Sequence, residues 1–144
     1  MATINRSIVI NAPADTIQEI TDDPDRLPEW YAGIEEVRTD GLFPKVGGKA
    51  EMVYKAAGVT FTVEQTAIEV EPGRRTKYEL QGMITGTYVE TMEPEGDATR
   101  YTLDFDYEMP GGGVGKVIDK LFVERMNTQQ LEQSLQNLKA LVEA

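Results

Sequence analysis

Residues 101–108 read Tyr101-Thr102-Leu103-Asp104-Phe105-Asp106-Tyr107-Glu108, with an apolar or aromatic side chain at every odd position and a polar one at every even position. Because successive side chains of a strand point to opposite faces of its sheet, this stretch predicts a strand with one dry and one wet face. The segment Met109-Pro110-Gly111-Gly112-Gly113 ends the alternation. From Val114 to Val142 the period becomes helical, which predicts one helix on the order of 45 Å long. A sheet followed by a helix that can cross it indicates an α+β fold.

The alternation extends back from residue 101 to Gly33, and turn residues such as Gly47-Gly48 and Pro72-Gly73 interrupt it at intervals. Between the turns we predict about six strands in an antiparallel meander, since parallel strands need long crossovers. From Thr85 to Glu93 the pattern is ambiguous. Tyr88 and Glu90 share one face of this strand, and the sequence does not decide whether that face is the inner one. On the other strands we predict that the inner faces carry Met52, Tyr54, Val59, Phe61, Val63, Tyr78 and Leu80.

The N-terminal part differs from the meander. Thr3 to Ile10 is rich in β-branched residues and predicts a first strand. Asn11-Ala12-Pro13 then signals the start of a helix, because proline suits the first helical turn. A second start at Asp23-Pro24 is closed almost at once by Pro28. We therefore expect two short helices after the first strand.

Composition excludes several function classes. The 144 residues include 25 acidic and 14 basic side chains, so the net charge is −11. Such a surface repels phosphate backbones and anionic headgroups, and we expect no nucleic-acid partner. There is no histidine and no cysteine, which removes the commonest general base and the commonest metal ligands. The pairs Asp22-Asp23 and Glu35-Glu36 are typical of a helix cap and a solvated strand end, so we expect no metal and no cofactor.

Apolar runs are too short for a signal peptide or a membrane span. We therefore expect a soluble, cytoplasmic protein without stable membrane insertion, as a monomer or a homodimer.

The centre of the long helix is less apolar than its ends. One face carries Val117 and Leu121, then Glu124 and Thr128, and then an apolar series from Leu131 to Val142. Two interpretations are open. Either the helix rotates slightly, so that Met126 points inward while Glu124 and Arg125 are solvated, or the centre of the helix faces a hollow to which Arg125 or Thr128 offers a polar contact.

Four segments carry a resemblance to a known family. They are Ile8-Val9-Ile10-Asn11-Ala12-Pro13-Ala14-Asp15-Thr16-Ile17, Asp22-Asp23-Pro24-Asp25-Arg26-Leu27-Pro28-Glu29-Trp30, Pro110-Gly111-Gly112-Gly113-Val114-Gly115-Lys116 and Ser134-Leu135-Gln136-Asn137-Leu138-Lys139. In this order they resemble the START-like (Bet v 1-like) superfamily, in particular its bacterial polyketide cyclase/dehydrase and lipid-transport branch, over essentially the whole chain. Gln18 departs from the pattern, because the family commonly has an aromatic residue there, and it indicates different packing or a polar group near the cavity rim.

The resemblance implies a helix-grip fold in one domain, residues 1–144. In that fold a curved antiparallel sheet of about seven strands wraps around the long C-terminal helix and leaves a cavity between them. Trp30 lies where family members close one end of the sheet, and it either has that structural role or contacts the ligand. We predict that the ligand-binding residues are Trp30, Met52, Tyr54, Phe61, Tyr78, Tyr88, Tyr101, Phe105, Leu121, Arg125 and Thr128.

Three functions fit these observations. The first is binding of a hydrophobic small molecule, such as a lipid or polyketide, which needs no acid–base pair. The second is a polyketide cyclase, aromatase or dehydratase, for which Glu90, Arg125 and a cavity tyrosine are the candidate catalytic groups. If Glu90 faces inward, burial should raise its pKa and make it a candidate general base. The third is a protein-interaction module like the co-chaperone relatives, although the predicted outer face is largely charged or polar.

Overall fold

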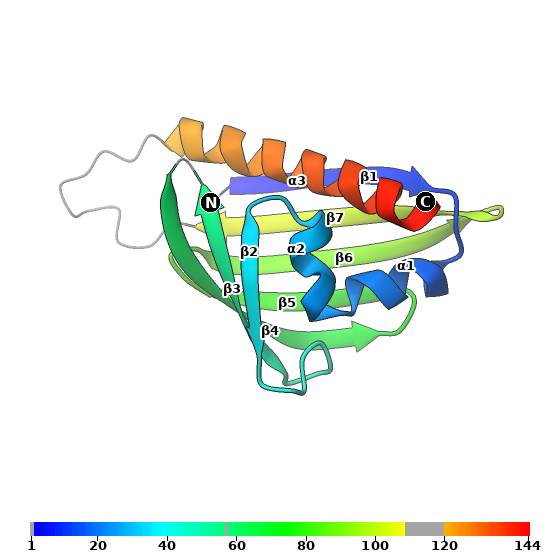
Figure 1. Cartoon of the computed structure of the whole chain (residues 1–144), viewed down its shortest axis with the longest axis horizontal. Coiled ribbons are helices and arrows are strands. Elements are labelled where there is room, and N and C mark those ends of the chain that lie inside the picture. Colours follow the sequence, from blue (N-terminus) through cyan, green and yellow to red (C-terminus); the bar gives the residue numbers. More distant parts are fainter. Residues whose placement is uncertain (1, 57, 109–119) are drawn as a thin grey trace.

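A computed structural model describes residues 2–56, 58–108 and 120–144. One seven-stranded antiparallel sheet has the order β1-β7-β6-β5-β4-β3-β2, and it curves around the long helix α3 (Figure 1). The elements are β1 (Ala2–Ile10), α1 (Ala14–Thr21), the 3₁₀ turn η1 (Pro24–Arg26), α2 (Leu27–Trp30), β2 (Ile34–Thr39), β3 (Lys49–Ala56), β4 (Val59–Glu71), β5 (Arg75–Gly82), β6 (Thr85–Glu95), β7 (Ala98–Glu108) and α3 (Lys120–Glu143).

The predicted fold class is confirmed: a curved antiparallel sheet, two short helices after the first strand and one long C-terminal helix. The predicted start of the long helix, Val114, lies outside the described residues. Within the described part of the chain, no helix combines the length and apolarity that crossing a bilayer requires.

The strand faces follow the predicted period of two. On β7 the side chains of Tyr101, Leu103, Phe105 and Tyr107 are buried, while the residues between them are partly exposed. The structure also decides the ambiguous strand β6, where Tyr88, Glu90 and Met92 point into the core. β1 pairs with β7, with Ala2 opposite Tyr107 and Ile10 opposite Thr99, so the first and last strands lie side by side.

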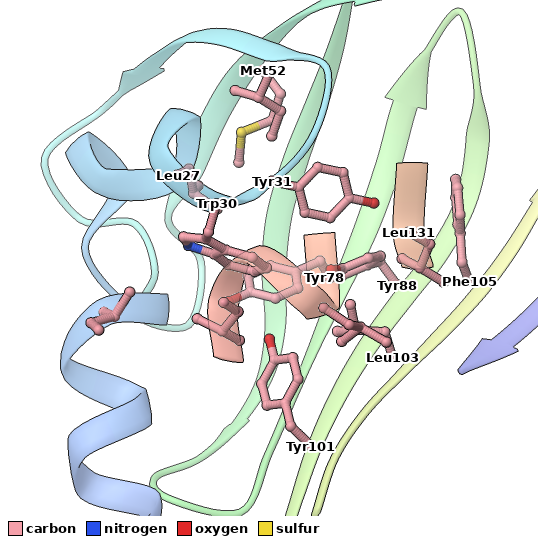
Figure 2. Close-up of a cluster of buried hydrophobic side chains, with 14 of the residues drawn as sticks. Leu27, Trp30, Tyr31, Met52, Tyr78, Tyr88, Tyr101, Leu103, Phe105 and Leu131 are labelled. Carbon is pink, nitrogen blue, oxygen red and sulfur yellow. The ribbon is translucent and has the colours of Figure 1, made fainter. Parts of the chain in front are cut away.

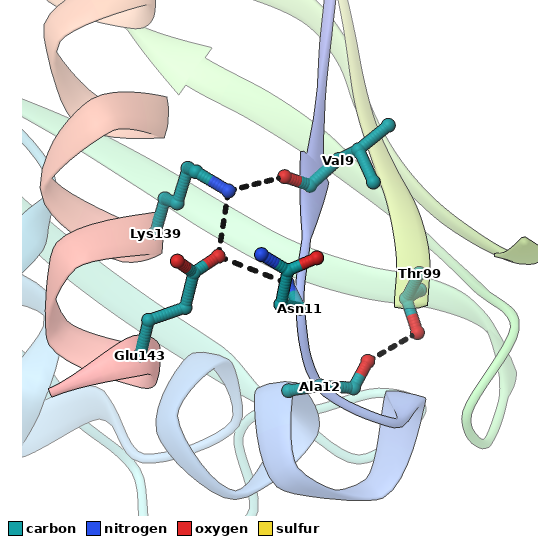
Figure 3. Close-up of polar contacts among 6 residues, drawn as sticks. All are labelled: Val9, Asn11, Ala12, Thr99, Lys139 and Glu143. Atoms are coloured by element: carbon teal, nitrogen blue, oxygen red, sulfur yellow. Dashed lines mark hydrogen bonds and ion pairs between the residues drawn. The ribbon is translucent and has the colours of Figure 1, made fainter. Parts of the chain in front are cut away.

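Polar contacts hold the C-terminal end of α3 against β1 (Figure 3). Lys139 Nζ donates to the carbonyl of Val9 at 2.8 Å and contacts Glu143 at 2.6 Å. The Glu143 carboxylate in turn accepts from the backbone N–H of Asn11 at 2.9 Å. These contacts fix the end of the helix at the point where the chain leaves β1.

A second set of contacts joins the middle of α3 to the segment around α2. Ser134 is fully buried, and its Oγ accepts from the backbone N–H of Ala32 at 2.8 Å while donating to the carbonyl of Gln130 at 2.6 Å. Asn137 Nδ2 donates to the carbonyl of Trp30 at 3.1 Å. Buried backbone groups need such partners, so these two side chains set the position of α2 and of the tyrosine that follows it.

Candidate functional site

A small cavity lies between the sheet and the N-terminal half of the described part of α3. Its apolar lining consists of Phe61, Val63, Leu80, Ile84 and Phe105, and its polar lining of Tyr31, Tyr54, Gln65, Tyr88, Asn127 and Gln130. Among these described lining residues there is no charged side chain. The free space inside amounts to about 20 Å³, which is room for about one water molecule.

Aromatic rings form one wall of this cavity. Tyr31 meets Tyr54 edge to face, with ring centroids 6.3 Å apart, and meets Tyr88 similarly at 6.1 Å. Phe61 stacks almost flat on Tyr54, with centroids 5.5 Å apart and an interplanar angle of 12°. Phe61 and Tyr54 are only partly buried, so this stacked pair stands at the rim. Ring pairs of this kind add stabilisation beyond the area they bury.

The polar groups of the lining are neutral. Burial raises the pKa of Tyr31, and burial together with the neighbouring Tyr31 raises the pKa of Tyr54 and of Tyr88 well above the usual value. All three phenols are therefore protonated near neutral pH. The side chain of Asn127 is 8% exposed, and its Nδ2 has no hydrogen-bond partner in the described part of the chain. The cavity thus offers an unpaired amide donor among neutral phenols.

Deeper in the core, Glu90 lies beside Tyr101. Glu90 is 3% exposed, and its Oε2 accepts a 2.6 Å hydrogen bond from the Tyr101 hydroxyl. Its Oε1 has no partner among the described residues. Burial raises the pKa of Glu90 to about 7, against the lowering effect of the Tyr101 hydrogen bond and with a smaller contribution from the negative charge of Asp22. The carboxyl is therefore largely protonated below neutral pH.

The aromatic side chains around this pair form one continuous cluster. Trp30 packs edge to face against Tyr101 with ring centroids 6.5 Å apart, and Tyr78 lies 6.1 Å from Tyr88. Figure 2 shows these rings converging from α2 and from the inner face of the sheet. Tyr88 contributes to the cavity lining and also belongs to this cluster, so it links the cavity to the core around Glu90.

A comparison with protein families shows which family the chain belongs to. A family model described as polyketide cyclase/dehydrase and lipid transport matches residues 1–143. The chain belongs to this family. A comparison with curated proteins found no match.

Three solved structures illustrate the similarity of the fold. Each is less than 25% identical in sequence to this chain, so these likenesses concern the fold alone. A START superfamily protein from Mycobacterium smegmatis has a TM-score of 0.80 and 17% identity, covering 98% of this chain and 97% of that one. The Zhui aromatase/cyclase from Streptomyces sp. R1128 has a TM-score of 0.79 and 17% identity, covering 99% and 93%. A protein from Chromobacterium violaceum has a TM-score of 0.73 and 23% identity, covering 100% and 99%.

In this member of the polyketide cyclase/dehydrase family, the predicted ligand-binding residues lie in different places. Tyr54, Phe61, Tyr88 and Phe105 line the cavity. Trp30, Met52, Tyr78 and Tyr101 are buried in the core instead. The side chain of Leu121 lies outside the described residues.

Two predicted residues of α3 are absent from the described lining of the cavity. Arg125 is exposed, and Thr128 Oγ1 donates to the carbonyl of Glu124 at 2.8 Å. Arg125 is therefore not among the described residues that line the cavity, and its role as a ligand-binding or catalytic group stays a prediction. The physical reason is the phase of the helix, because Asn127 takes the inward position and residues two apart on a helix face away from each other. Met126, which points inward in one of the two interpretations left open by the sequence, is only partly buried.

Several lining residues were not predicted, although some had a signal. Gln65 continues the period-two series of Phe61 and Val63 on β4, so the alternation alone could have identified it. Tyr31 follows α2 with an extended backbone at φ −80° and ψ 110°, which no periodicity indicates. Gln18, the departure from the family pattern, donates from Nε2 to Asp22 at 2.9 Å and is absent from the described cavity lining.

Proposed function

We propose that this chain binds a hydrophobic small molecule, of lipid, polyketide or similar type, in the cavity between the sheet and α3. The observation that carries the proposal is the lining itself: aromatic and aliphatic side chains enclose a few neutral polar groups. Binding sites for small molecules commonly have this composition. Membership of the polyketide cyclase/dehydrase and lipid transport family supports the same function.

The cavity described here is in a closed form. Its free volume of about 20 Å³ is far below the several hundred that ligand sites usually have. The Phe61 ring on the partly buried rim is stacked on Tyr54 in the way a flat ligand would stack. Ligand binding in this proposal displaces the Phe61 ring outward, and the ligand takes its place against Tyr54. Each methylene group that the ligand then buries contributes about 0.8 kcal/mol.

The test is native mass spectrometry of the protein purified gently from its own host. A small molecule that co-purifies with the wild-type protein, and whose amount changes in Phe61→Ala, supports the proposal and identifies the chemical class. Bare protein in repeated preparations, together with no response to a panel of apolar probes, argues against it.

A second function has one observation in its favour. The buried Glu90–Tyr101 pair, with a Glu90 pKa of about 7, has the protonation behaviour of a general acid–base group. A cyclase or dehydratase would use it to move a proton at a carbon next to a carbonyl group. Two observations weigh against this: Glu90 is not among the described lining residues, and Arg125 is exposed.

Proton exchange separates the two functions. If Glu90 acts as a base, the protein should speed hydrogen–deuterium exchange at the α-carbon of a bound ketone, observed by NMR in D₂O, and Glu90→Gln should abolish the effect. A pure binding protein leaves the exchange rate of the ketone unchanged while still binding it.

A further inference from the structure

The unpaired amide of Asn127 gives information about the ligand. Asn127 is on α3, lines the cavity and is 8% exposed. Its side chain lies close enough to the Tyr107 hydroxyl to lower the pKa of that phenol, but its Nδ2 has no partner at hydrogen-bond geometry in the part of the chain that the structure describes. Buried donors are almost always paired, because an unpaired one loses its bonds to water without replacement. A buried orphan donor at a cavity wall therefore indicates an acceptor that the cavity is built to receive.

The surroundings restrict what that acceptor can be. No lysine or arginine is among the described lining residues, so within this described lining a buried carboxylate or phosphate has no cation to offset its desolvation. Burial also raises the pKa of Tyr31, Tyr54 and Tyr88, which keeps these phenols neutral. The site is consequently suited to a neutral oxygen.

Among neutral oxygens, a carbonyl fits better than a hydroxyl. A carbonyl oxygen has two lone pairs and brings no donor of its own, so it can accept from Asn127 Nδ2 and from a phenol O–H at the same time. A ligand hydroxyl would add another donor to a site that already has an unpaired one. The flat rings of Tyr54 and Phe61 at the rim favour a planar group next to that carbonyl.

We propose that Asn127 Nδ2 is the anchor for a carbonyl oxygen, and that the ligand class of this cavity is neutral aromatic ketones. The inference rests on the proposed function, since it specifies the ligand of the same cavity.

The experiment uses two probes of nearly the same shape, acetophenone and α-methylstyrene, in which a C=CH₂ group replaces the C=O group. Their dissociation constants are measured by NMR titration of the full chain labelled with ¹⁵N. Compared with a variant that lacks the donor, we expect the wild-type protein to favour acetophenone over α-methylstyrene about fivefold to tenfold more strongly, which is the contribution of one hydrogen bond. The side-chain N–H₂ signals of Asn127, assigned by their loss in Asn127→Leu, should shift with acetophenone and not with α-methylstyrene.

Variants assign the preference to Asn127. Asn127→Leu removes the donor at similar size, and because it leaves the carbonyl of bound acetophenone without that partner, it should shift the ratio of the two affinities toward α-methylstyrene. Asn127→Met serves the same purpose if the branched side chain prevents folding, because methionine adapts to irregular space. Gln136→Leu is the matched control on the exposed side of α3, and it should keep the wild-type preference.

The outcomes separate the two proposals. A ratio of the two affinities that stays at its wild-type value in Asn127→Leu and Asn127→Met overturns the carbonyl anchor and leaves the binding function intact. No binding of either probe to the wild-type protein or to Phe61→Ala overturns the binding function and the inference with it.

Discussion

Replacing Glu90 by glutamine should remove a pH dependence of stability that this one buried carboxyl creates. Burial raises its pKa from 4.5 to about 7 in the folded protein. The folded state therefore binds more protons than the unfolded state between these values, and stability falls as the pH rises through this window. At 1.36 kcal/mol for each pH unit, the whole interval amounts to about 3 kcal/mol of stability lost above pH 7.

The assay is urea unfolding of the wild-type protein and Glu90→Gln from pH 5.5 to 8.5, with the difference in free energy of unfolding taken at each pH. Other carboxylates titrate in both proteins and largely cancel. Because glutamine stays neutral, the variant should gain on the wild type by about 2 kcal/mol across this range. Tyr101→Phe provides a matched comparison. Without the hydrogen bond that lowers the pKa of Glu90, the loss of stability should continue to higher pH.

A difference between wild type and Glu90→Gln that stays constant from pH 5.5 to 8.5 would refute the reasoning. It would mean that Glu90 keeps an ordinary pKa in the folded protein. Water or a cation would then reach its Oε1.

Three further changes test the packing. Phe61→Ala should open a space of the size that accepts a benzene ring, so that acetophenone binds more tightly by NMR titration; unchanged affinity would show that Phe61 does not block the site. Thr99→Val should cost about 1–3 kcal/mol in urea unfolding, because the Thr99 hydroxyl donates to the buried carbonyl of Ala12 at 2.8 Å (Figure 3). Ser134→Ala should cost a similar amount, about 1–3 kcal/mol, because it leaves the N–H of Ala32 unpaired; a neutral result in either case would mean that water replaces the lost partner.

The sheet could be predicted from sequence where the two faces of a strand differ in polarity. On β7, Tyr101 to Tyr107 leave only one orientation that buries the aromatic rings. β6 could not be assigned in this way, because a carboxylate shares a face with Tyr88. A charged side chain normally marks the outer face, and Glu90 breaks this rule by taking up a proton and a Tyr101 hydrogen bond.

The candidate site was harder to predict for a different reason. Helical periodicity fixes the inward face only through apolar residues, and the centre of α3 around Arg125, Asn127 and Thr128 is polar. An error of one residue there turns the face by about 100°, since a helix has 3.6 residues per turn. Pattern alone also gives no volume, so the sequence left open whether the cavity is empty or filled.

The pairing of β1 with β7 has a consequence for how the chain is made. Asn5 and Asp104, opposite each other in that pair, are 99 residues apart. On the ribosome, each strand from β3 to β6 can pair with the strand synthesised just before it, while β1 waits for β7 during roughly 5–20 s at ordinary elongation rates. Throughout that interval the backbone groups of β1 and the side chains of Ile4 and Ile10 lack their final cover. Chaperones that bind extended apolar segments should therefore engage this strand during synthesis, and release it only when β7 has emerged.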